Sequence, residues 1–165
     1  MTRNKHPLRA AALAALLLSA PAWALESDRN QPIEIEADQG SLDQGSQSTV
    51  FSGNVKIRQG SMYINAARVE VNKDAAGNQN MKASGKPVTF GQQLEKQGMV
   101  KGQANEVRYT SQTGIVTLTG NAKVERGSDM ARGHTIVYNT RTEVYTVSGG
   151  SKGRVSVVIQ PQNKK

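Results

Sequence analysis

Residues 53–61 of the chain read Gly-Asn-Val-Lys-Ile-Arg-Gln-Gly-Ser, and residues 120–128 read Gly-Asn-Ala-Lys-Val-Glu-Arg-Gly-Ser. The two stretches match at an offset of 67 residues. In each, aliphatic and charged residues alternate between a Gly-Asn pair and a Gly-Ser pair. Alternation with a period of two is typical of a β-strand with one buried face. The two stretches therefore predict one kind of strand, used twice.

The similarity extends well beyond these two strands. The same offset, without gaps, aligns Ala37-Asp38 with Ala104-Asn105, Leu42 with Tyr109, and Val69 with Ile136. After Asn72 the second copy is three residues shorter. A unit repeated at this length indicates a supersecondary structure whose copies stack to close a common core. We therefore expect two similar half-units.

Strand patterns continue along the chain. Ile33–Glu36 and Val69–Asn72 also alternate with a period of two, and Gly-containing turns separate the segments at the roughly 8–12-residue spacing of all-β folds. No apolar stripe with helical spacing follows residue 24. The sequence predicts one all-β domain over residues 25–160, for which a sandwich, a barrel, a jelly roll and a solenoid remain possible.

The two ends of the chain are expected to lie outside this domain. Arg3, Lys5 and Arg9 precede a short apolar run over residues 10–18, and Ala22-x-Ala24 follows. These are the three parts of a secretory signal, and the run is shorter than the about 20 residues that span a bilayer. We expect residues 1–24 to be cleaved, leaving a soluble exported protein. Residues 161–165 are expected to form a flexible basic tail.

Composition excludes several kinds of chemistry. The chain has no cysteine, so thiolate chemistry is excluded. Without residues 1–24, 18 Lys and Arg stand against 13 Asp and Glu, a net charge of +5. The basic residues are dispersed and lack interleaved aromatic residues, so we expect no nucleic-acid partner.

Catalytic and metal-binding patterns are also missing. His134 is the only histidine outside residues 1–24, and no Gly-x-Ser-x-Gly segment accompanies it. Glu34 and Glu36 alternate with Ile33 and Ile35, so their carboxylates should point away from the apolar face. We expect no enzyme activity, no metal site and no cofactor.

With these strands described, the chain resembles the OstA-like family of periplasmic lipopolysaccharide-transport proteins. The resemblance rests on segments across nearly the whole exported chain: Gln31–Asp38, Phe51–Val55, Gln59-Gly60, Ile64–Ala66, Val69–Val71, Gly85–Phe90 and Leu118–Ala122. It implies an open antiparallel β-jelly roll of V-shaped strands around an apolar interior. It also implies lipopolysaccharide transport from an inner-membrane export complex to an outer-membrane assembly complex, through similar jelly rolls stacked end to end and without a cofactor.

The expected site is a trough that shelters lipid A. The resemblance matches its lipid-contacting residues to Ile33, Ile35 and Phe90, with Lys73 near the mouth as a contact for the lipid headgroup. Alternation adds further aliphatic and aromatic side chains, so that the predicted lining is Ile33, Ile35, Val55, Ile57, Ile64, Val69, Val71, Val88, Phe90, Leu118, Val124, Ile136 and Tyr138. The same side chains could instead pack on one another, and small residues such as Gly53, Ala66, Gly120 and Ala122 are expected to keep the trough open.

Two segments predict exposed sheet edges. Ile33 and Ile35 near one end of the domain, and Val155, Val157 and Ile159 near the other, lie in strands that are poorly protected against pairing with another chain. We expect head-to-tail pairing between copies of the chain. The alternative is an exported structural or adhesive β-repeat protein without lipid cargo, which predicts a filled core.

Overall fold

The computed structural model describes residues 26–95, 98–142, 144–151 and 153–161, so the expected signal at residues 1–24 lies outside the described residues. One short helix, α1, covers Glu26–Arg29. The strands that follow are β1 (Glu34–Glu36), β2 (Gln39–Asp43), β3 (Ser48–Gln59), β4 (Met62–Lys73), β5 (Gln79–Leu94), β6 (Gly98–Thr110), β7 (Ile115–Arg126), β8 (Asp129–Asn139), β9 (Val144–Ser148) and β10 (Ser156–Val158).

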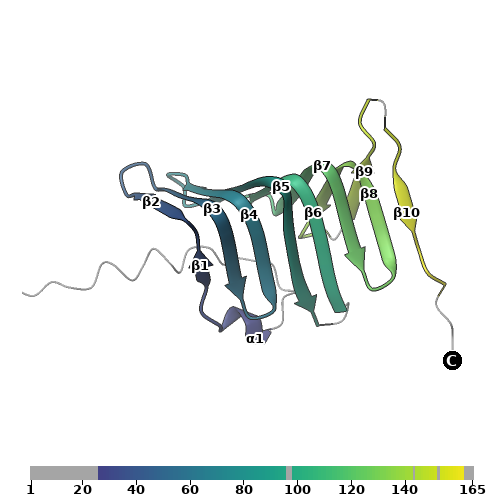
Figure 1. Ribbon diagram of the computed structural model, residues 1–165, viewed down its shortest axis with the longest axis horizontal. Coiled ribbons are helices and arrows are strands. Elements are labelled where there is room, and N and C mark those ends of the chain that lie inside the picture. The colour runs from purple at the N-terminus through teal and green to yellow at the C-terminus, as the bar shows by residue number, and fades with distance from the viewer. Residues whose placement is uncertain (1–25, 96–97, 143, 152, 162–165) are drawn as a thin grey trace, which may run out of the picture.

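All strands belong to one antiparallel sheet that does not close on itself. The order is β1-β3-β4-β5-β6-β7-β8-β10, with β2 also on β3 and β9 also on β8. The strands β1 and β2 therefore lie at one end of the sheet, and β9 and β10 at the other (Figure 1). This confirms the prediction of an open, antiparallel all-β fold.

Each long strand is interrupted once, at about its middle. The pairing register shifts between Ser52 and Val55 on β3, and between Thr119 and Ala122 on β7. Shifts at corresponding places interrupt β4, β5 and β6. Bulges bend strands and increase their local twist. The bends divide the sheet into an upper layer (β2, β9 and the strand halves at 48–52, 68–73, 79–84, 106–110, 115–119 and 135–139) and a lower layer (β1, β10 and the remaining halves).

The repeated Gly-Asn pairs form two of these bends. Gly53 and Gly120 have φ angles of 77° and 78°, and Asn54 and Asn121 have φ angles of 47° and 50°. Glycine and asparagine are the residues that adopt this left-handed conformation most readily. The repeat of two half-units is thus confirmed as architecture, with the Gly-Asn pairs at equivalent bends.

Gly53 is also required by a close neighbour. A Cβ atom at Gly53 would collide with the side chain of Asp38, whose Oδ2 accepts a hydrogen bond of 2.9 Å from Asn54 Nδ2. At the equivalent bend, a Cβ atom at Gly120 would lie 2.8 Å from Asn105 Nδ2. The expectation that Gly53 and Gly120 keep the interior open was therefore wrong, because both residues lie at the bends and admit a polar side chain there.

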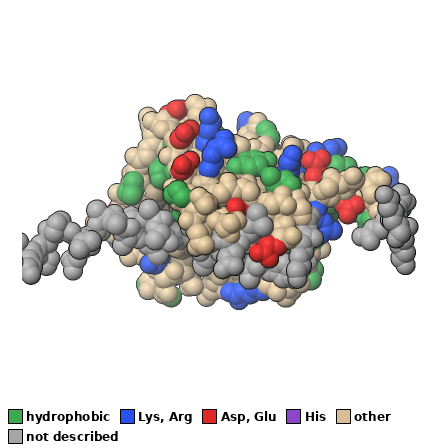
Figure 2. Space-filling view, turned by 90° about the horizontal axis from the view of Figure 1, so that it is seen from below, with side chains coloured by type: hydrophobic (Ala, Val, Ile, Leu, Met, Phe, Trp, Pro, Cys, Tyr) green, Lys and Arg blue, Asp and Glu red, His purple; other side chains and the backbone are tan. Residues whose placement is uncertain are grey.

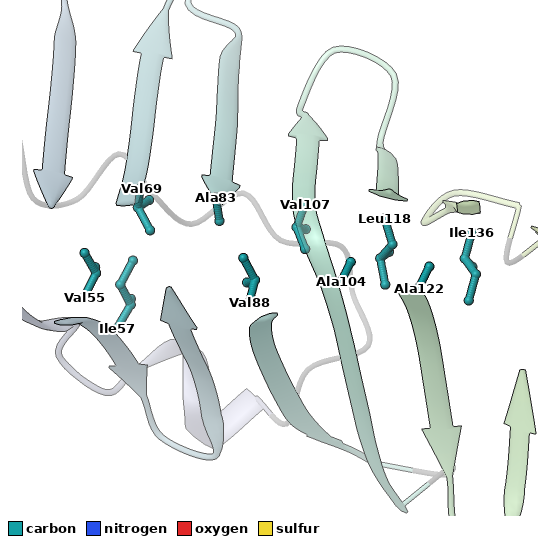
Figure 3. Packing of buried hydrophobic residues seen from close by; sticks show 10 residues of the cluster. All are labelled: Val55, Ile57, Val69, Ala83, Val88, Ala104, Val107, Leu118, Ala122 and Ile136. Atoms are coloured by element: carbon teal, nitrogen blue, oxygen red, sulfur yellow. The ribbon is translucent and has the colours of Figure 1, made fainter. Parts of the chain in front are cut away.

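The core lies between the two layers, close to the bends. Figure 3 shows its side chains facing one another in two rows. The upper layer contributes Val69, Ala83, Val107, Leu118 and Ile136, and the lower layer contributes Val55, Ile57, Val88, Ala104 and Ala122. These ten residues are 0–6% exposed. Ala122 is thus part of the packed core and does not keep the interior open.

Helix α1 was not predicted, because a four-residue helix is too short to show a periodic pattern. It lies beside the turn between β3 and β4. The buried Asp28 forms a hydrogen bond with the Ser61 hydroxyl, and Gln59 Nε2 donates to the Gln31 carbonyl at 3.1 Å. In the described part of the chain, no helix is long and apolar enough to cross a membrane.

The bends lead to a first prediction about stability. Gly53→Ala should lower the free energy of unfolding more than Gly127→Ala, measured by urea denaturation. Both glycines have positive φ angles (77° and 59°), so both variants should lose about 1–2 kcal/mol from backbone strain. Only Gly53 has a side chain against it, since the space around Gly127 is open within 4 Å. Overpacking should add about 1–3 kcal/mol at Gly53. Equal losses would contradict the role of the Asp38 contact.

Candidate functional site

The interior between the layers is the main apolar surface of the fold. Strand alternation places twelve of the thirteen predicted lining residues on its walls, and Ile33, just before β1, packs against the core. The structure divides them into two groups by burial. Six lie within the packed core: Val55, Ile57, Val69, Val88, Leu118 and Ile136. The other seven are only partly buried, and we call them the rim residues: Ile33, Ile35, Ile64, Val71, Phe90, Val124 and Tyr138.

The six core residues fill space rather than line it. They are 0–5% exposed and contact one another across the layers. Interiors packed in this way have almost no voids larger than a water molecule. A ligand could reach these side chains only by separating the two layers.

Most rim residues lie farther from the bends along their strands than the core residues, although Ile64 lies directly opposite the core residue Ile57. Ile64 and Val71 lie at the two sides of the β4 bend, on the lower and the upper layer respectively. Both pack against the core but remain partly accessible. The walls of the interior are therefore apolar and partly uncovered away from the bends. Whether lipid contacts them stays a prediction.

Phe90 is held in place by a glycine on the neighbouring strand. It lies directly opposite Gly102 in the pairing of β5 with β6. A Cβ atom at Gly102 would collide with the Phe90 ring, so the ring occupies the space that a side chain at Gly102 would fill. A large apolar surface thus lies flat on the lower wall.

Sequence reasoning missed several interior positions. Met62, Met81, Val116, Ala131 and Val147 also pack partly buried against the core. The same two-residue period could have found them, if it had been followed along the whole of each strand and methionine and alanine had been counted as apolar.

Lys73 lies at the outer end of β4, two residues beyond Val71. Strand alternation places it on the interior side of the upper layer. Its backbone N–H donates to the Gln47 carbonyl at 3.1 Å, and it lines a shallow hollow with Asp74 and Gly77. A cation at this outer end suits the predicted contact with a lipid headgroup, which also stays a prediction.

The outer faces of the layers are polar. On the upper layer, the Glu106 carboxylate lies 2.6 Å from Arg108 Nε and 3.2 Å from Lys82 Nζ. Arg108, and then Lys82, hold the pKa of Glu106 below its usual value despite an opposing effect of burial. Figure 2 shows acidic and basic side chains side by side on the face seen from below, with hydrophobic side chains among them.

The large exposed hydrophobic residues gather at the two ends of the sheet. They are Leu42 (58%) on β2, Val144 (57%) and Tyr145 (47%) on β9, and Val155 (48%), Val157 (55%), Val158 (38%) and Ile159 (76%) in or beside β10. We call β1 and β2 the head edge, and β9 and β10 the tail edge. The strands β1 (Glu34–Glu36) and β10 (Ser156–Val158) end the strand order, so the segments 33–36 and 155–159 lie at the two ends of the sheet. Their use as edges for pairing between copies stays a prediction.

The parts of the edges formed by β2 and β9 were missed. The sequence holds only part of the signal, because the repeat aligns Leu42 with Tyr109. The pairing in the structure shows that Tyr109 has strand neighbours on both sides, whereas Leu42 has one on β3 alone.

An open antiparallel sheet, bent once along each strand around an apolar interior, defines the class of β-jelly-roll proteins with two free ends. The family model described as "LptA/(LptD N-terminal domain) LPS transport protein" matches residues 34–144, more than half of the chain. The chain therefore belongs to this family of lipopolysaccharide-transport proteins, which confirms the resemblance seen in the sequence.

Individual relatives agree with this assignment. The lipopolysaccharide export system protein LptA of Haemophilus influenzae is 37% identical over 149 residues, which cover 88% of this chain and 87% of the relative. LptA of Escherichia coli K12 is 35% identical over 153 residues, covering 90% and 83%. The crystal structure of LptH from Pseudomonas aeruginosa, a periplasmic component of the lipopolysaccharide transport device, superposes with a TM-score of 0.69 at 29% identity, covering 82% of this chain and 99% of LptH.

The division of the interior leads to a second prediction. Ile136→Ala should lower the free energy of unfolding by about 2–5 kcal/mol, because it leaves a cavity in the packed core. Ile64→Ala removes the same atoms from the rim and should cost less, since Ile64 already contacts solvent. Urea denaturation of both variants measures the difference. A loss at Ile64 as large as that at Ile136 would mean that the rim is packed as tightly as the core.

Proposed function

We propose that this chain binds the lipid A part of lipopolysaccharide between its two layers and passes it across the periplasm. The observation that carries the proposal is the partly uncovered apolar rim in a member of a lipopolysaccharide-transport family. Family membership also disfavours the alternative of a structural or adhesive protein without lipid cargo.

The physical need for such an interior follows from the lipid itself. Each CH₂ group of an acyl chain exposed to water costs about 0.8 kcal/mol. For a lipid with several acyl chains the cost reaches tens of kcal/mol by the same arithmetic. A continuous apolar wall along the rim residues would remove most of this cost while the sugar part remains in water.

The rim alone cannot set the direction of transport. A binding site shifts an equilibrium only by its differential affinity for two states. We therefore propose an energy-using export complex in the inner membrane as the donor of lipid, and an assembly complex in the outer membrane as the acceptor. The chain would act between them as a soluble periplasmic component.

Spanning the compartment would require several copies in line. The head and tail edges carry most of the large exposed hydrophobic residues, and each presents strands with one free side. Strand addition between the tail edge of one copy and the head edge of the next would cover both. Because such a contact is heterologous, it can extend into an open rod.

Photocrosslinking tests the lipid path directly. A photoreactive residue at Phe90 or Ile35, both on the interior wall, should form lipopolysaccharide adducts in living cells. The matched controls are Thr89 and Glu36, which are next in sequence and face outward by strand alternation. We expect adducts at the interior pair at least several-fold above the outer pair. Adducts at neither interior position, or equal labelling of all four, would contradict the proposed path.

A further inference from the structure

The tail edge is a second copy of an internal strand. In the first half-unit, β4 pairs with β5 so that Ile64 lies opposite Phe90. In the second, β8 pairs with β10 so that Ala131 lies opposite Val157. Ala131 lies 67 positions after Ile64, and Val157 lies 67 positions after Phe90. The upper layer repeats as well: Val69 lies opposite Ala83, and Ile136 opposite Val147. Here β9 follows β5 at an offset of 64, because the second copy is three residues shorter after Asn72. Thus β9 and β10 together correspond to β5, interrupted at its bend.

The head edge is likewise a copy of β6. Ile35 lies opposite Ile57 on β3, as Gly102 lies opposite Val124 on β7. In the upper layer Gly40 lies opposite Phe51, as Val107 lies opposite Leu118. In both comparisons each residue of the second pair lies 67 positions after its counterpart in the first pair. Thus β1 and β2 together correspond to β6, again interrupted at the bend.

Inside the chain, the strands β5 and β6 pair with each other. We infer that the same pairing is used between molecules, so that the β5–β6 seam fixes the register in which the tail edge of one copy joins the head edge of the next. The inference rests on the proposed head-to-tail association and adds its register. The partner is a second copy of this chain.

The internal seam then gives each pair of residues across the junction. Phe90 lies opposite Gly102 and Met81 opposite Tyr109. By equivalence, Val157 should lie opposite Ile35 of the next copy, and Tyr145 opposite Leu42. These pairs would cover Val157, Tyr145 and Leu42, which are 55%, 47% and 58% exposed in the single chain. The interior walls would continue across the junction, because all four residues face inward.

The residues on the outer face of the β5–β6 seam change from neutral to charged at the two edges, in a way that fits another copy as the partner. Inside the chain, Asn65 Nδ2 donates to Thr89 Oγ1 at 3.2 Å, and Thr89 lies opposite Gln103. This row of neutral residues becomes Arg132, Ser156 and Glu36 at the junction. At the junction Arg132 thus takes the place of Asn65, and Glu36 takes the place of Gln103. The small Ser156 lies between them, so that the two charged side chains can meet across it. Arg132 and Glu36 are both exposed in the single chain.

The segments around the two edges carry opposite charge, although β9 and β10 themselves contain no charged residue. Residues 33–47, which include the head edge, contain Glu34, Glu36, Asp38 and Asp43 but no lysine or arginine. Residues 144–161, which include the tail edge, contain Lys152 and Arg154 but no carboxylate side chain. Head-to-tail contact brings unlike charges together, whereas head-to-head contact places carboxylates against carboxylates. Such charge patterns select partners and register.

Disulfide trapping tests the register, because the natural chain has no cysteine. Two single-cysteine proteins of different size, Val157→Cys and Ile35→Cys, are mixed and oxidised. Directly opposite residues have Cβ atoms about 4.5–5.5 Å apart, whereas a diagonal neighbour lies about 7–8 Å away. The mixed dimer should therefore form at least several-fold faster for this pair than for Val157→Cys with Ile33→Cys, a register shift of two on the same face.

The other possible outcomes show whether the register alone is wrong or whether the proposed association is wrong as well. Preferential coupling to position 33 would overturn the register while leaving head-to-tail contact in place. Oligomers in light scattering without either mixed disulfide would place the contact elsewhere and overturn the inference. A chain that stays monomeric at all concentrations would overturn the proposed association itself, and the register with it.

Charge exchange tests the register independently. Glu36→Lys and Arg132→Glu should each weaken self-association about two- to fivefold or more, from the range measured for cross-strand charge pairs. A mixture of the two variants restores an unlike pair at the junction between them and should associate more tightly than either variant alone. Rescue of this kind would not follow from a general loss of fold. Mixtures no tighter than the single variants would overturn the pairing of Arg132 with Glu36.

Discussion

The bend in each long strand is the constraint on which the rest of the structure depends. A strand that alternates apolar and polar residues can bury only one face, and a single flat sheet of such strands would leave that face in water. By bending once, each strand supplies both walls of the same interior. The Gly53-Asn54 and Gly120-Asn121 pairs allow this because they adopt positive φ angles where Asp38 and Asn105 approach.

Distance from the same bend also separates the packed core from most of the partly uncovered rim. Close to it, the layers are near enough for valine, alanine, leucine and isoleucine to fill the space between them, and Leu118 and Ile136 are almost completely buried. Farther away the layers leave side chains such as Ile64 and Val124 partly uncovered. Folding energy therefore comes mainly from the core beside the bends, and the rim is where we propose that a ligand binds. The sheet also stays open at both ends, which leaves the strand edges free for the head-to-tail contact that we propose.

Much of the architecture could be predicted from the sequence, because strand periodicity and the repeat are local or self-consistent signals. The alternation of Val55 to Arg58 identified a strand and its buried face, and the match of Gly53-Asn54 with Gly120-Asn121 identified two half-units. The role of the glycines was not predictable, because it depends on Asp38, which reaches Asn54 only once the strands pair. The separation of Val69 in the core from Val71 at the rim was also hidden, since both follow the same period and differ only in their distance from the bend. Helix α1 is fixed by the contact of Asp28 with Ser61, between segments far apart in the sequence.

The central claim is that the acyl chains of lipopolysaccharide enter between the layers and contact the rim. Fluorescence of a single tryptophan measures this most directly in a protein that lacks residues 1–24, which contain Trp23, the only tryptophan of the sequence. Tyr138→Trp places the probe on the interior wall, and Val137→Trp places it on the outer face of the same strand. Added lipopolysaccharide should shift the emission of the Tyr138→Trp protein to shorter wavelength and leave that of the Val137→Trp protein unchanged. A shift at both positions, or at Val137 alone, would contradict an interior path for the lipid.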